Sequence, residues 1–491
     1  MSDIPKAWAL SNIGIVCTYL QRGRSPKYCD HSALPVINQR SIRWHGIDSQ
    51  YLKYVHPDQF PQWSNERYVR AGDVLWNSTG TGTLGRACLI KDADVATPKV
   101  VDSHVTILRP NPQVVDSRFL FYWIKGPTIQ NMIDALSSGT TNQIELNRST
   151  ISETRIPIPP LNEQKRIADK LDVLLEAIAA CRKRIHLVQQ RFPDQFRNAV
   201  LCHAFKGNLS QSGSDQFDCP SQEEIAKSRA MIQPNVKQDI YPPLTESELK
   251  PLMELPSGWR WEKAGNIAQS IVPNRDKPKS FSGNIPWVTT PQLSDSAIEI
   301  RYNSPSAGLS TDEIATYNCR VVPSQSVIMT CVGSLGITAI TVEPCVINQQ
   351  LHAFVTHDLI NPKYFAYALK YQKVWLEQNA TSTTVRYLNK NNCNSVPIPL
   401  CSKAEQEIIA NRVEHLFAMC TRIESALETL DLRLNKITDV ILRAAFRGEL
   451  VAQDPNDESA IDLLARIHRA PADPMIPRRA KVPKKEKTLV T

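Results

Sequence analysis

The sequence predicts an α+β protein in which two globular α/β domains alternate with two long helices that pair as an antiparallel coiled coil. Two observations lead to this prediction: the second half of the chain repeats the first, and each copy carries one long run of apolar residues at heptad spacing. A chain of 491 residues with 42% hydrophobic and 22% charged residues is too long for one core and has the composition of a folded, soluble protein.

The repeat sets the order of the elements. The stretch IPIPPLNEQKRIADKL at 156–171 returns as VPIPLCSKAEQEIIANRV at 396–413, and AFKGNL at 204–209 returns as AFRGEL at 445–450. Upstream, DSRFLFYWIK resembles NPKYFAYALK, which predicts one helix in each globular part. The predicted segments are a first globular domain (1–155), a first spacer helix (156–206), a linker (207–254) with a short helix near 222–231, a second globular domain (255–395), a second spacer helix (396–450), and a C-terminal helix with a basic tail (451–491).

The two helical segments have narrow apolar seams. In both copies the apolar residues step by three and four, which is typical of the a and d positions of a coiled coil. The seams are Ile167, Leu171, Leu174, Ile178, Cys181, Ile185, Val188 and Phe192 in the first copy, and Ile409, Val413, Leu416, Cys420, Ile423, Leu427, Leu430, Leu434, Ile437 and Ile441 in the second. A pseudo-two-fold axis would make the paired helices antiparallel. The alternative, packing of each helix on its own domain alone, would favour a wider apolar stripe.

The helix boundaries are also readable. Ser402 followed by Glu405 fits a capping box, and Asn162 is the expected N-cap after the Pro159-Pro160 pair. Pro193 lies inside the first seam, so we expect it to kink that helix or to restart it.

Composition narrows the class of protein. The formal charge of +8 permits a polyanionic partner without requiring one, and part of it lies in the tail at 478–487, which is more typical of a solvated segment than of a DNA-binding arm. The twelve cysteines are scattered and no CxxC occurs, so we expect reduced thiols rather than disulfides or zinc. No signal-peptide or membrane-spanning pattern is visible, which makes the cytoplasm the expected compartment.

Catalytic motifs are missing. GTGTLG at 80–85 fits GxGxxG, but the residues after it are not an amphipathic helix, so a glycine turn between strands is favoured over a dinucleotide site. The sequence has no P-loop, no NPPY or DPPY, no HExxH and no convincing nuclease arrangement. His104 and His352 lie in strands that we take as corresponding, and core histidines are favoured there over catalytic bases.

Two pairs of loops are candidates for binding. SSGTTNQ at 137–143 and NATSTTVR at 379–386 hold the same place in each copy, as do WNSTGTG at 76–82 and MTCVGS at 329–334. Small hydroxyl and amide side chains contact phosphates and base edges, although ordinary turns also use them. The residues predicted to lie near DNA are Asn77, Ser78, Thr79, Thr81, Ser138, Gly139, Thr140, Thr141, Asn142, Thr330, Ser334, Ser382, Thr383, Thr384 and Arg386.

Taken together, these features resemble the specificity (S) subunits of type I restriction-modification enzymes. The resemblance covers nearly the whole chain and rests on IPIPPLNEQKRIADKLD, VPIPLCSKAEQEIIANRVEHLF, the AFKGNL and AFRGELVAQD helix ends, and LPSGWRWEKAGNI at 255–267. The second copy departs from the usual PPLxEQ by two extra residues before Glu405-Gln406. That departure changes the expected helix start and leaves the resemblance intact.

The resemblance implies a function. Each globular part would be a target recognition domain that reads one half of a bipartite, asymmetric double-stranded DNA site. The helices would set the spacing between the half-sites and dock two modification subunits. The resemblance places Glu163, Gln164, Glu405 and Gln406 at partner-binding positions. The modification subunits would carry S-adenosylmethionine and methylate adenine, while restriction subunits would use ATP and Mg²⁺ for translocation and cleavage. This chain would bind no cofactor or metal and would have no catalytic residues.

The spacer helices also predict a length. The seam from Ile409 to Ile441 corresponds to ~48 Å at ~1.5 Å per residue, or ~14 base pairs of DNA. Such helices could act as a ruler between two half-sites. Two alternatives are a single-chain methyltransferase or nuclease with fused recognition domains, which the missing motifs disfavour, and a coiled-coil scaffold that never touches DNA, which leaves the two globular domains unexplained.

Overall fold

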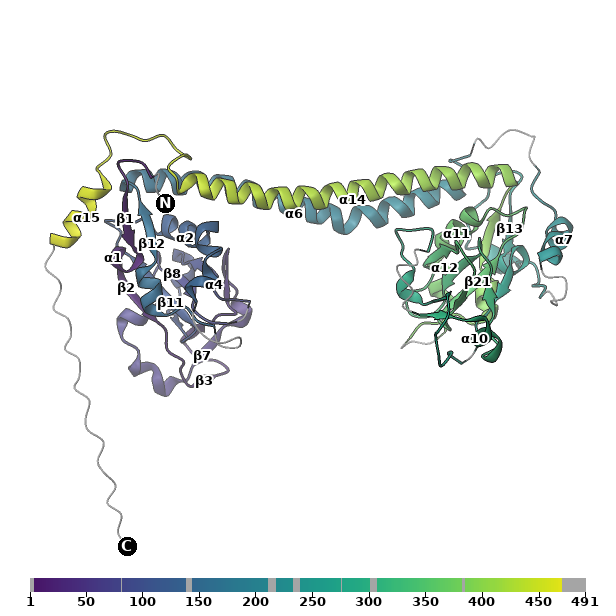
Figure 1. Ribbon diagram of the computed structural model, residues 1–491, viewed down its shortest axis with the longest axis horizontal. Helices are drawn as coiled ribbons and strands as arrows, with labels where there is room; N and C mark the ends of the chain where they lie inside the picture. Colours follow the sequence, from purple (N-terminus) through teal and green to yellow (C-terminus); the bar gives the residue numbers. More distant parts are fainter. Residues whose placement is uncertain are drawn as a thin grey trace, which may run out of the picture. The chain divides into compact units, whose positions relative to one another are not determined.

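The computed structural model divides the chain into two compact units. It describes residues 4–80, 82–137, 144–210, 218–232, 239–274, 276–300, 307–381 and 385–469. The first unit comprises Met1–Arg184 and Leu430–Thr491, and the second comprises Ile185–Thr429. Each unit therefore contains one globular domain together with the start of one long helix and the end of the other (Figure 1).

The globular domain of the first unit contains two main sheets. One is antiparallel, with strands in the order β2 (Cys17–Arg22), β11 (Val105–Pro110), β8 (Val74–Asn77) and β9 (Ala87–Leu89). The other has the order β10 (Val100–Val101), β4 (Pro35–Ile37), β7 (Lys53–Val55) and β3 (Tyr28–Cys29), with β10 and β4 parallel. Helix α2 (Ser117–Lys125) packs on the antiparallel sheet, where Trp76, Phe119 and Trp123 are buried. The remaining elements are α1 (Ile13–Val16), the hairpin β5 (Ile42–Arg43) and β6 (Gly46–Ile47), α3 (Pro127–Gln130), α4 (Ile133–Leu136) and α5 (Arg148–Glu153).

The second domain repeats this frame, as the sequence predicts. Its antiparallel sheet has the order β14 (Gln269–Ile271), β21 (Leu351–Val355), β18 (Val327–Thr330) and β19 (Thr338–Ile340). Its other sheet has the order β16 (Gly308–Leu309), β15 (Ile285–Val288), β20 (Cys345–Ile347) and β17 (Val321–Val322), and again one pair, β15 and β20, is parallel. Helix α11 (Pro362–Tyr371) takes the place of α2. The remaining elements are α9 (Ala264–Ile267), α10 (Thr311–Thr316), α12 (Lys373–Gln378) and α13 (Lys390–Asn394).

The repeated proline motif forms a strand in each domain. Strand β12 (Arg155–Ile158) pairs with β1 (Ala9–Asn12), and β22 (Pro397–Leu400) pairs with β13 (Arg260–Lys263). Each of these sheets has only two strands, so the prolines can sit on a side that needs no ladder hydrogen bond. The motif therefore closes its domain by tying the last strand to the first, immediately before the long helix begins.

The long helices, α6 (Leu161–Phe205) and α14 (Lys403–Ala445), pair in the antiparallel sense that the sequence predicts. In the first unit Arg182 Nε lies 3.1 Å from Asp431 Oδ1, and in the second unit Arg197 Nη2 lies 2.6 Å from Glu424 Oε2. The residue numbers of the partners decrease along α14 as they increase along α6, so the two helices run in opposite directions. Helix α6 continues through Pro193, so a restart of the helix there is wrong, while a kink stays a prediction. The turn after Pro193 is held to α14 by the ion pair of Arg197 with Glu424, which helps to offset the loss of one backbone hydrogen bond.

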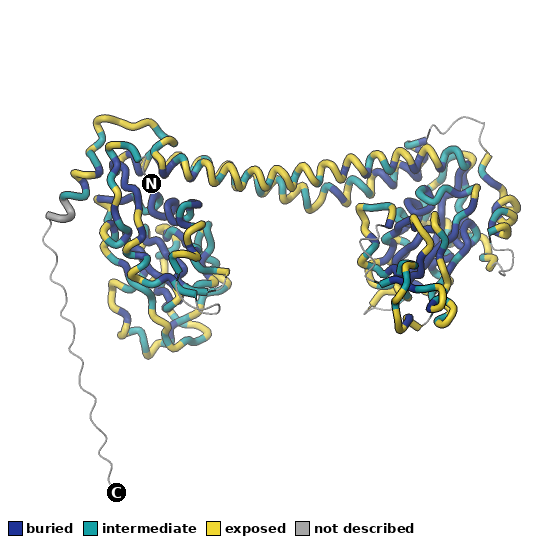
Figure 2. The backbone as a smooth tube through the Cα atoms, in the orientation of Figure 1, coloured by how far each residue is buried: buried dark blue, intermediate teal, exposed yellow. Residues whose placement is uncertain are grey.

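The apolar seams are only partly covered by this pairing. Ile167, Leu171, Ile409 and Val413, near the starts of the helices, are fully buried against the domains. Farther along, the seam residues Val188, Ile423, Leu430 and Ile437 are each at least 40% exposed (Figure 2). Pairing of the two helices therefore covers these seams only in part.

The two helix starts differ. The predicted cap at Ser402 is confirmed, since the Glu405 N–H donates to Ser402 Oγ at 3.3 Å and Ser402 Oγ donates to Glu405 Oε2 at 3.0 Å. The predicted cap at Asn162 is wrong: α6 already begins at Leu161, and the Gln164 N–H donates to the Pro160 carbonyl. The proline fixes the start without a side-chain cap.

Much of the segment predicted as a linker belongs to the second domain. It contains α7 (Gln222–Ile232) and α8 (Glu246–Leu249), and Ile225 of α7 lies in the domain core. Buried Arg229 donates to the Asn266 carbonyl at 3.1 Å. At the corresponding place after the second repeat, α15 (Ala460–Arg469) packs Ala460 and Leu463 into the core of the first domain. Each domain is thus completed by the segment that follows the other domain's long helix. Within the described residues, no helix has the length and apolarity needed to cross a bilayer.

Candidate nucleic-acid interface

Polar loops converge at one edge of the antiparallel sheet in the first domain. Strand β8 ends at Asn77, opposite the start of β11 at Val105. The Ser78 N–H donates to the His104 carbonyl and the Leu146 N–H donates to the Ser78 carbonyl, at 2.9 and 2.8 Å. The loop after β8, the turn before β11 and the segment that contains Leu146 therefore meet at this edge.

The second domain builds the same edge from different residues. Strand β18 ends at Thr330, opposite the start of β21 at Leu351. The Cys331 N–H donates to the Gln350 carbonyl at 2.9 Å, and the Gly333 N–H donates to the Arg386 carbonyl at 2.9 Å. The loop pairs that the sequence singles out thus lie together in each domain, as far as the described residues extend.

Three of the predicted DNA-contacting residues are buried within these loops. Asn77 Nδ2 donates to the Gln39 and Thr83 carbonyls, Ser78 Oγ is hydrogen-bonded to Thr106 Oγ1, and Thr330 Oγ1 accepts from the Ile337 N–H. These groups shape the loops and offer DNA no exposed side chain in this structure.

The other predicted residues fall into two groups. Thr79 is half-buried, and Ser334 and Arg386 are exposed, so a DNA contact by these three stays a prediction. Thr81, Ser138, Gly139, Thr140, Thr141, Asn142, Ser382, Thr383 and Thr384 lie outside the described residues.

The glycine-rich stretch is a turn, which confirms the sequence interpretation. GTGTLG connects antiparallel β8 to β9, and Gly80, Gly82 and Gly85 all have positive φ, a conformation that side chains with a Cβ rarely adopt. No helix follows it to hold a pyrophosphate.

The two histidines do not correspond. Strand register aligns Val105 with Leu351, so His104 matches Gln350, and His352 matches Thr106. His352 is buried and hydrogen-bonded to Ser270 Oγ, as predicted, and burial lowers its pKa to about 3. His104 is exposed in the turn before β11, so its prediction as a core residue is wrong. Apolar residues follow both histidines, and only the strand register reveals the two-residue difference.

Basic side chains that were not predicted from the sequence lie over aromatic rings in the first domain. Arg40 and Arg43 lie over the Tyr51 ring, 5.0 and 5.2 Å from its centroid, and Lys53 lies 4.6 Å from that of Tyr28. Arg40 follows the Gln39 carbonyl that accepts from Asn77, so this loop is tied to the edge. Cationic groups of this kind can neutralise phosphates.

At the opposite end of each domain, the repeated Glu-Gln pair joins domain and helix. In the first domain Glu163 accepts from the Trp8 indole N–H at 3.0 Å. Gln164 accepts from the Asp116 N–H and donates to the Val114 and Pro159 carbonyls, all at 2.9 Å. Asp116 is the N-cap of α2, so one amide links the domain helix, its preceding loop and the long helix.

The second joint uses the same contacts. Glu405 accepts from the Trp259 indole at 3.2 Å, and Gln406 accepts from the Asn361 N–H at 2.9 Å while it donates to the Leu359 and Cys401 carbonyls. Asn361 is the N-cap of α11. The Glu-Gln pair thus has a structural role in both domains, and its contact with partner subunits stays a prediction.

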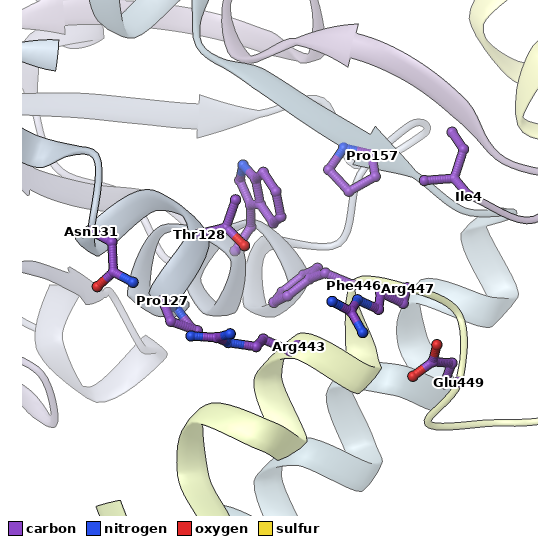
Figure 3. Close-up of a pocket in the computed structure, with 10 residues that line it drawn as sticks. Ile4, Pro127, Thr128, Asn131, Pro157, Arg443, Phe446, Arg447 and Glu449 are labelled. Atoms are coloured by element: carbon purple, nitrogen blue, oxygen red, sulfur yellow. The ribbon is translucent and has the colours of Figure 1, made fainter. Parts of the chain in front are cut away.

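A pocket of about 690 Å³ lies beside the first joint. Its charged groups are Arg443, Arg447 and Glu449 (Figure 3). Its apolar lining comes from Ile4, Trp123, Pro127, Pro157 and Phe446. The lining includes no histidine or cysteine and only one acid, so it offers no acid-base pair or nucleophile. In the second domain the residue that matches Phe446 is Phe205, which is fully buried between Tyr364 and Tyr371.

Two copies of one mixed domain, each with a polar loop edge, together with two paired helices define a protein with a duplicated domain architecture. Among the residues that the structure describes, no group of three or more histidine, cysteine or acidic side chains could hold a metal ion. The family model described as the type I restriction modification DNA specificity domain matches residues 5–190 and 256–430, once per repeat. The chain belongs to this family, which confirms the resemblance seen in the sequence.

Related sequences and solved structures agree with this family assignment. The chain is 26% identical over 417 residues to the EcoBI specificity subunit of Escherichia coli, covering 78% of this chain and 80% of that one. It is 23% identical over 470 residues to the StySPI specificity subunit of Salmonella potsdam, covering 92% and 90%. The HsdS subunit from Thermoanaerobacter tengcongensis shares the fold, with a TM-score of 0.56 at 18% identity over 91% of this chain and 98% of that one. A structure from work on assembly of the type I R-M system gives a TM-score of 0.64 at 19% identity, over 92% and 100%.

Proposed function

We propose that this chain is the non-catalytic specificity subunit of a type I restriction-modification complex, in which each domain reads one half of a bipartite, asymmetric double-stranded DNA site. The observation that carries the proposal is the pair of polar edges. They occupy the same place in two equivalent frames, yet their exposed side chains differ, with His104 in one and Ser334, Gln350 and Arg386 in the other. Equivalent frames with different contents suit two different half-sites.

The spacer helices set the gap between the half-sites in this proposal. Both are continuous over more than 40 residues, 45 in α6 and 43 in α14, and they are tied together by ion pairs in each unit. An insertion of four residues into each helix adds ~6 Å of helix, or ~2 base pairs of DNA. We expect the preferred gap in a methylation-site map to lengthen by that amount. An unchanged gap would mean that the helices do not set the distance between the half-sites.

The open seams are the surface on which two modification subunits dock in this proposal. The free energy falls when a partner helix removes the exposed apolar side chains of these helices from water. The exposed apolar residues of α6 are Val173, Leu187 and Val188, and those of α14 are Ile408, Met419, Ile423, Leu430, Leu432, Ile437 and Val440. The modification subunits would carry S-adenosylmethionine, restriction subunits would carry ATP and Mg²⁺, and the compartment would be the cytoplasm.

Docking can be tested on two exposed seam residues. The double variant Leu430→Glu, Ile437→Glu places charges where we expect apolar contact, so it should weaken assembly with the modification subunit by roughly 100-fold or more. Thr429→Glu, on the same helix at an exposed polar position, is the matched control and should assemble normally. Sedimentation of the mixed subunits measures both. Equal assembly of all three chains would exclude this surface.

The reading of half-sites is tested by exchange of one domain. Residues 1–155 are replaced by the first domain of another family member, and the host's methylated sites are mapped. We expect one half-site to change and the other to remain. A change in both halves would contradict independent reading, and methylation by the purified chain alone would favour a fused enzyme.

A further inference from the structure

The turn before the central strand has the same construction in both domains. In the first, Asp102 Oδ1 accepts from the His104 N–H at 2.9 Å. In the second, Asn348 Oδ1 accepts from the Gln350 N–H at 3.1 Å. The first turn connects β10 to β11, and the second connects β20 to β21. Strands β10 and β20 each belong to a parallel pair, and β11 and β21 each lie between two neighbours in their sheet.

Neighbouring strands hold the backbone of both turns. The His104 carbonyl accepts from the Ser78 N–H, and the Gln350 carbonyl accepts from the Cys331 N–H, both at 2.9 Å. In the first domain Arg22 adds a further support, because it donates to the Ser103 carbonyl and forms an ion pair with Glu145 at 3.0 Å. A side chain on such a turn starts from a fixed position, which recognition of a single base requires.

Both side chains are exposed, and a threonine orients each of them. His104 Nδ1 lies 2.6 Å from Thr79 Oγ1, and Gln350 Oε1 accepts from Thr290 Oγ1 at 3.4 Å and from Asn348 Nδ2 at 3.2 Å. Within the described residues, the Nε2 atoms of both side chains make no hydrogen bond. Each residue thus has one edge held by the protein and one nitrogen directed to solvent.

We infer that His104 and Gln350 are equivalent specificity-determining residues, each of which contacts a base edge in the half-site of its own domain. The inference rests on the proposed function. Amide and imidazole nitrogens form directional hydrogen bonds with the acceptors that bases present in the major groove. An uncharged glutamine cannot neutralise a phosphate, whereas Arg40 and Arg386, exposed at the same edges, can.

The test uses the full chain assembled with its modification subunit. Binding is measured for wild type, His104→Ala and Gln350→Ala on duplexes in which each base pair of the wild-type site is replaced in turn. For each variant we expect the penalty at one position, in one half-site only, to fall by ~10- to 100-fold, which is the discrimination of one good base contact. The His104 position should lie in the half-site that changes when residues 1–155 are exchanged.

Two further variants keep the result interpretable. Gln113→Ala removes an exposed side chain just beyond the other end of β11 and should leave all penalties unchanged. His104→Gln and Gln350→His should change the preferred base rather than abolish preference. If the wild-type complex reads a bipartite site and both alanine variants keep every penalty, the inference is wrong and the proposed function stands. A wild-type complex without a bipartite site would overturn both.

Discussion

The two domains share a frame but differ in how they fill it. At the joints, the same three residue types make the same contacts: tryptophan to glutamate, and glutamine to the backbone of the domain helix cap. At the loop edges and in parts of the core, equivalent positions hold different residues, such as Thr106 and His352. A duplicated recognition protein can therefore diverge in what it reads as long as the joint to the helix is kept.

The residues directly before β8 and β18 should give the largest difference in stability between the domains. In the first domain Asp73, whose side chain is fully buried, pairs with Arg109 at 2.8 Å, while the matching Ser326 bonds through its N–H to Thr341 Oγ1. Arg109→Met removes the guanidinium and leaves the buried Asp73 carboxylate with the Arg70 N–H as its remaining donor, so we expect a loss of about 3–5 kcal/mol in the free energy of unfolding. Urea unfolding followed by tryptophan fluorescence measures it. A loss below about 1 kcal/mol would show that the hydrogen bond from the Arg70 N–H is enough to hold the buried carboxylate.

The joints should respond alike. Gln164→Leu and Gln406→Leu each leave one backbone N–H and two carbonyls without their partner, and we expect each to cost about 2–4 kcal/mol. Gln113→Ala, an exposed position, should cost little. Thermal unfolding of the three variants checks this. Costs that differ strongly between the two joints would mean that the repeated motif does different work in the two domains.

Much of this frame can be predicted from the sequence, because the helix seams and the IPIP motif are local patterns. The exchange of segments between domains cannot, since the burial of Ile225 and Leu463 depends on which core each short helix meets. The alignment of His104 with His352 was wrong for a similar reason: apolar residues follow both, and only pairing with β8 and β18 fixes the register. At the edges the sequence indicated loops that lie together in each domain, but not which of their side chains point outward.

Low pH should destabilise the second domain more than the first, by a smaller amount than the substitutions above. Burial lowers the pKa of His352 to about 3, so the unfolded chain binds a proton between about pH 6.5 and 3 that the native chain does not. Stability is therefore lost as the pH falls through this window, by about 1.4 kcal/mol per pH unit. His352→Thr, which installs the residue found in the first domain, should flatten this slope. Unfolding free energies at pH 7, 6 and 5 test the prediction, and equal slopes would contradict it.

The smallest effect should come from the difference between the two joints themselves. Strand register and the joint contacts place Ser402 where the first copy has Pro160, so the two extra residues predicted before Glu405 are wrong. The Ser402 side chain caps α14, while α6 starts after two prolines without such a cap. Ser402→Ala should cost about 1 kcal/mol. Because Ser402 Oγ also donates to Glu405, the variant should loosen the Glu405 contact with Trp259, which fluorescence of that tryptophan in a variant lacking the other indoles can detect. If Ser402→Ala leaves both stability and fluorescence unchanged, the serine cap contributes nothing to the second joint, and the two joints are equivalent in energy.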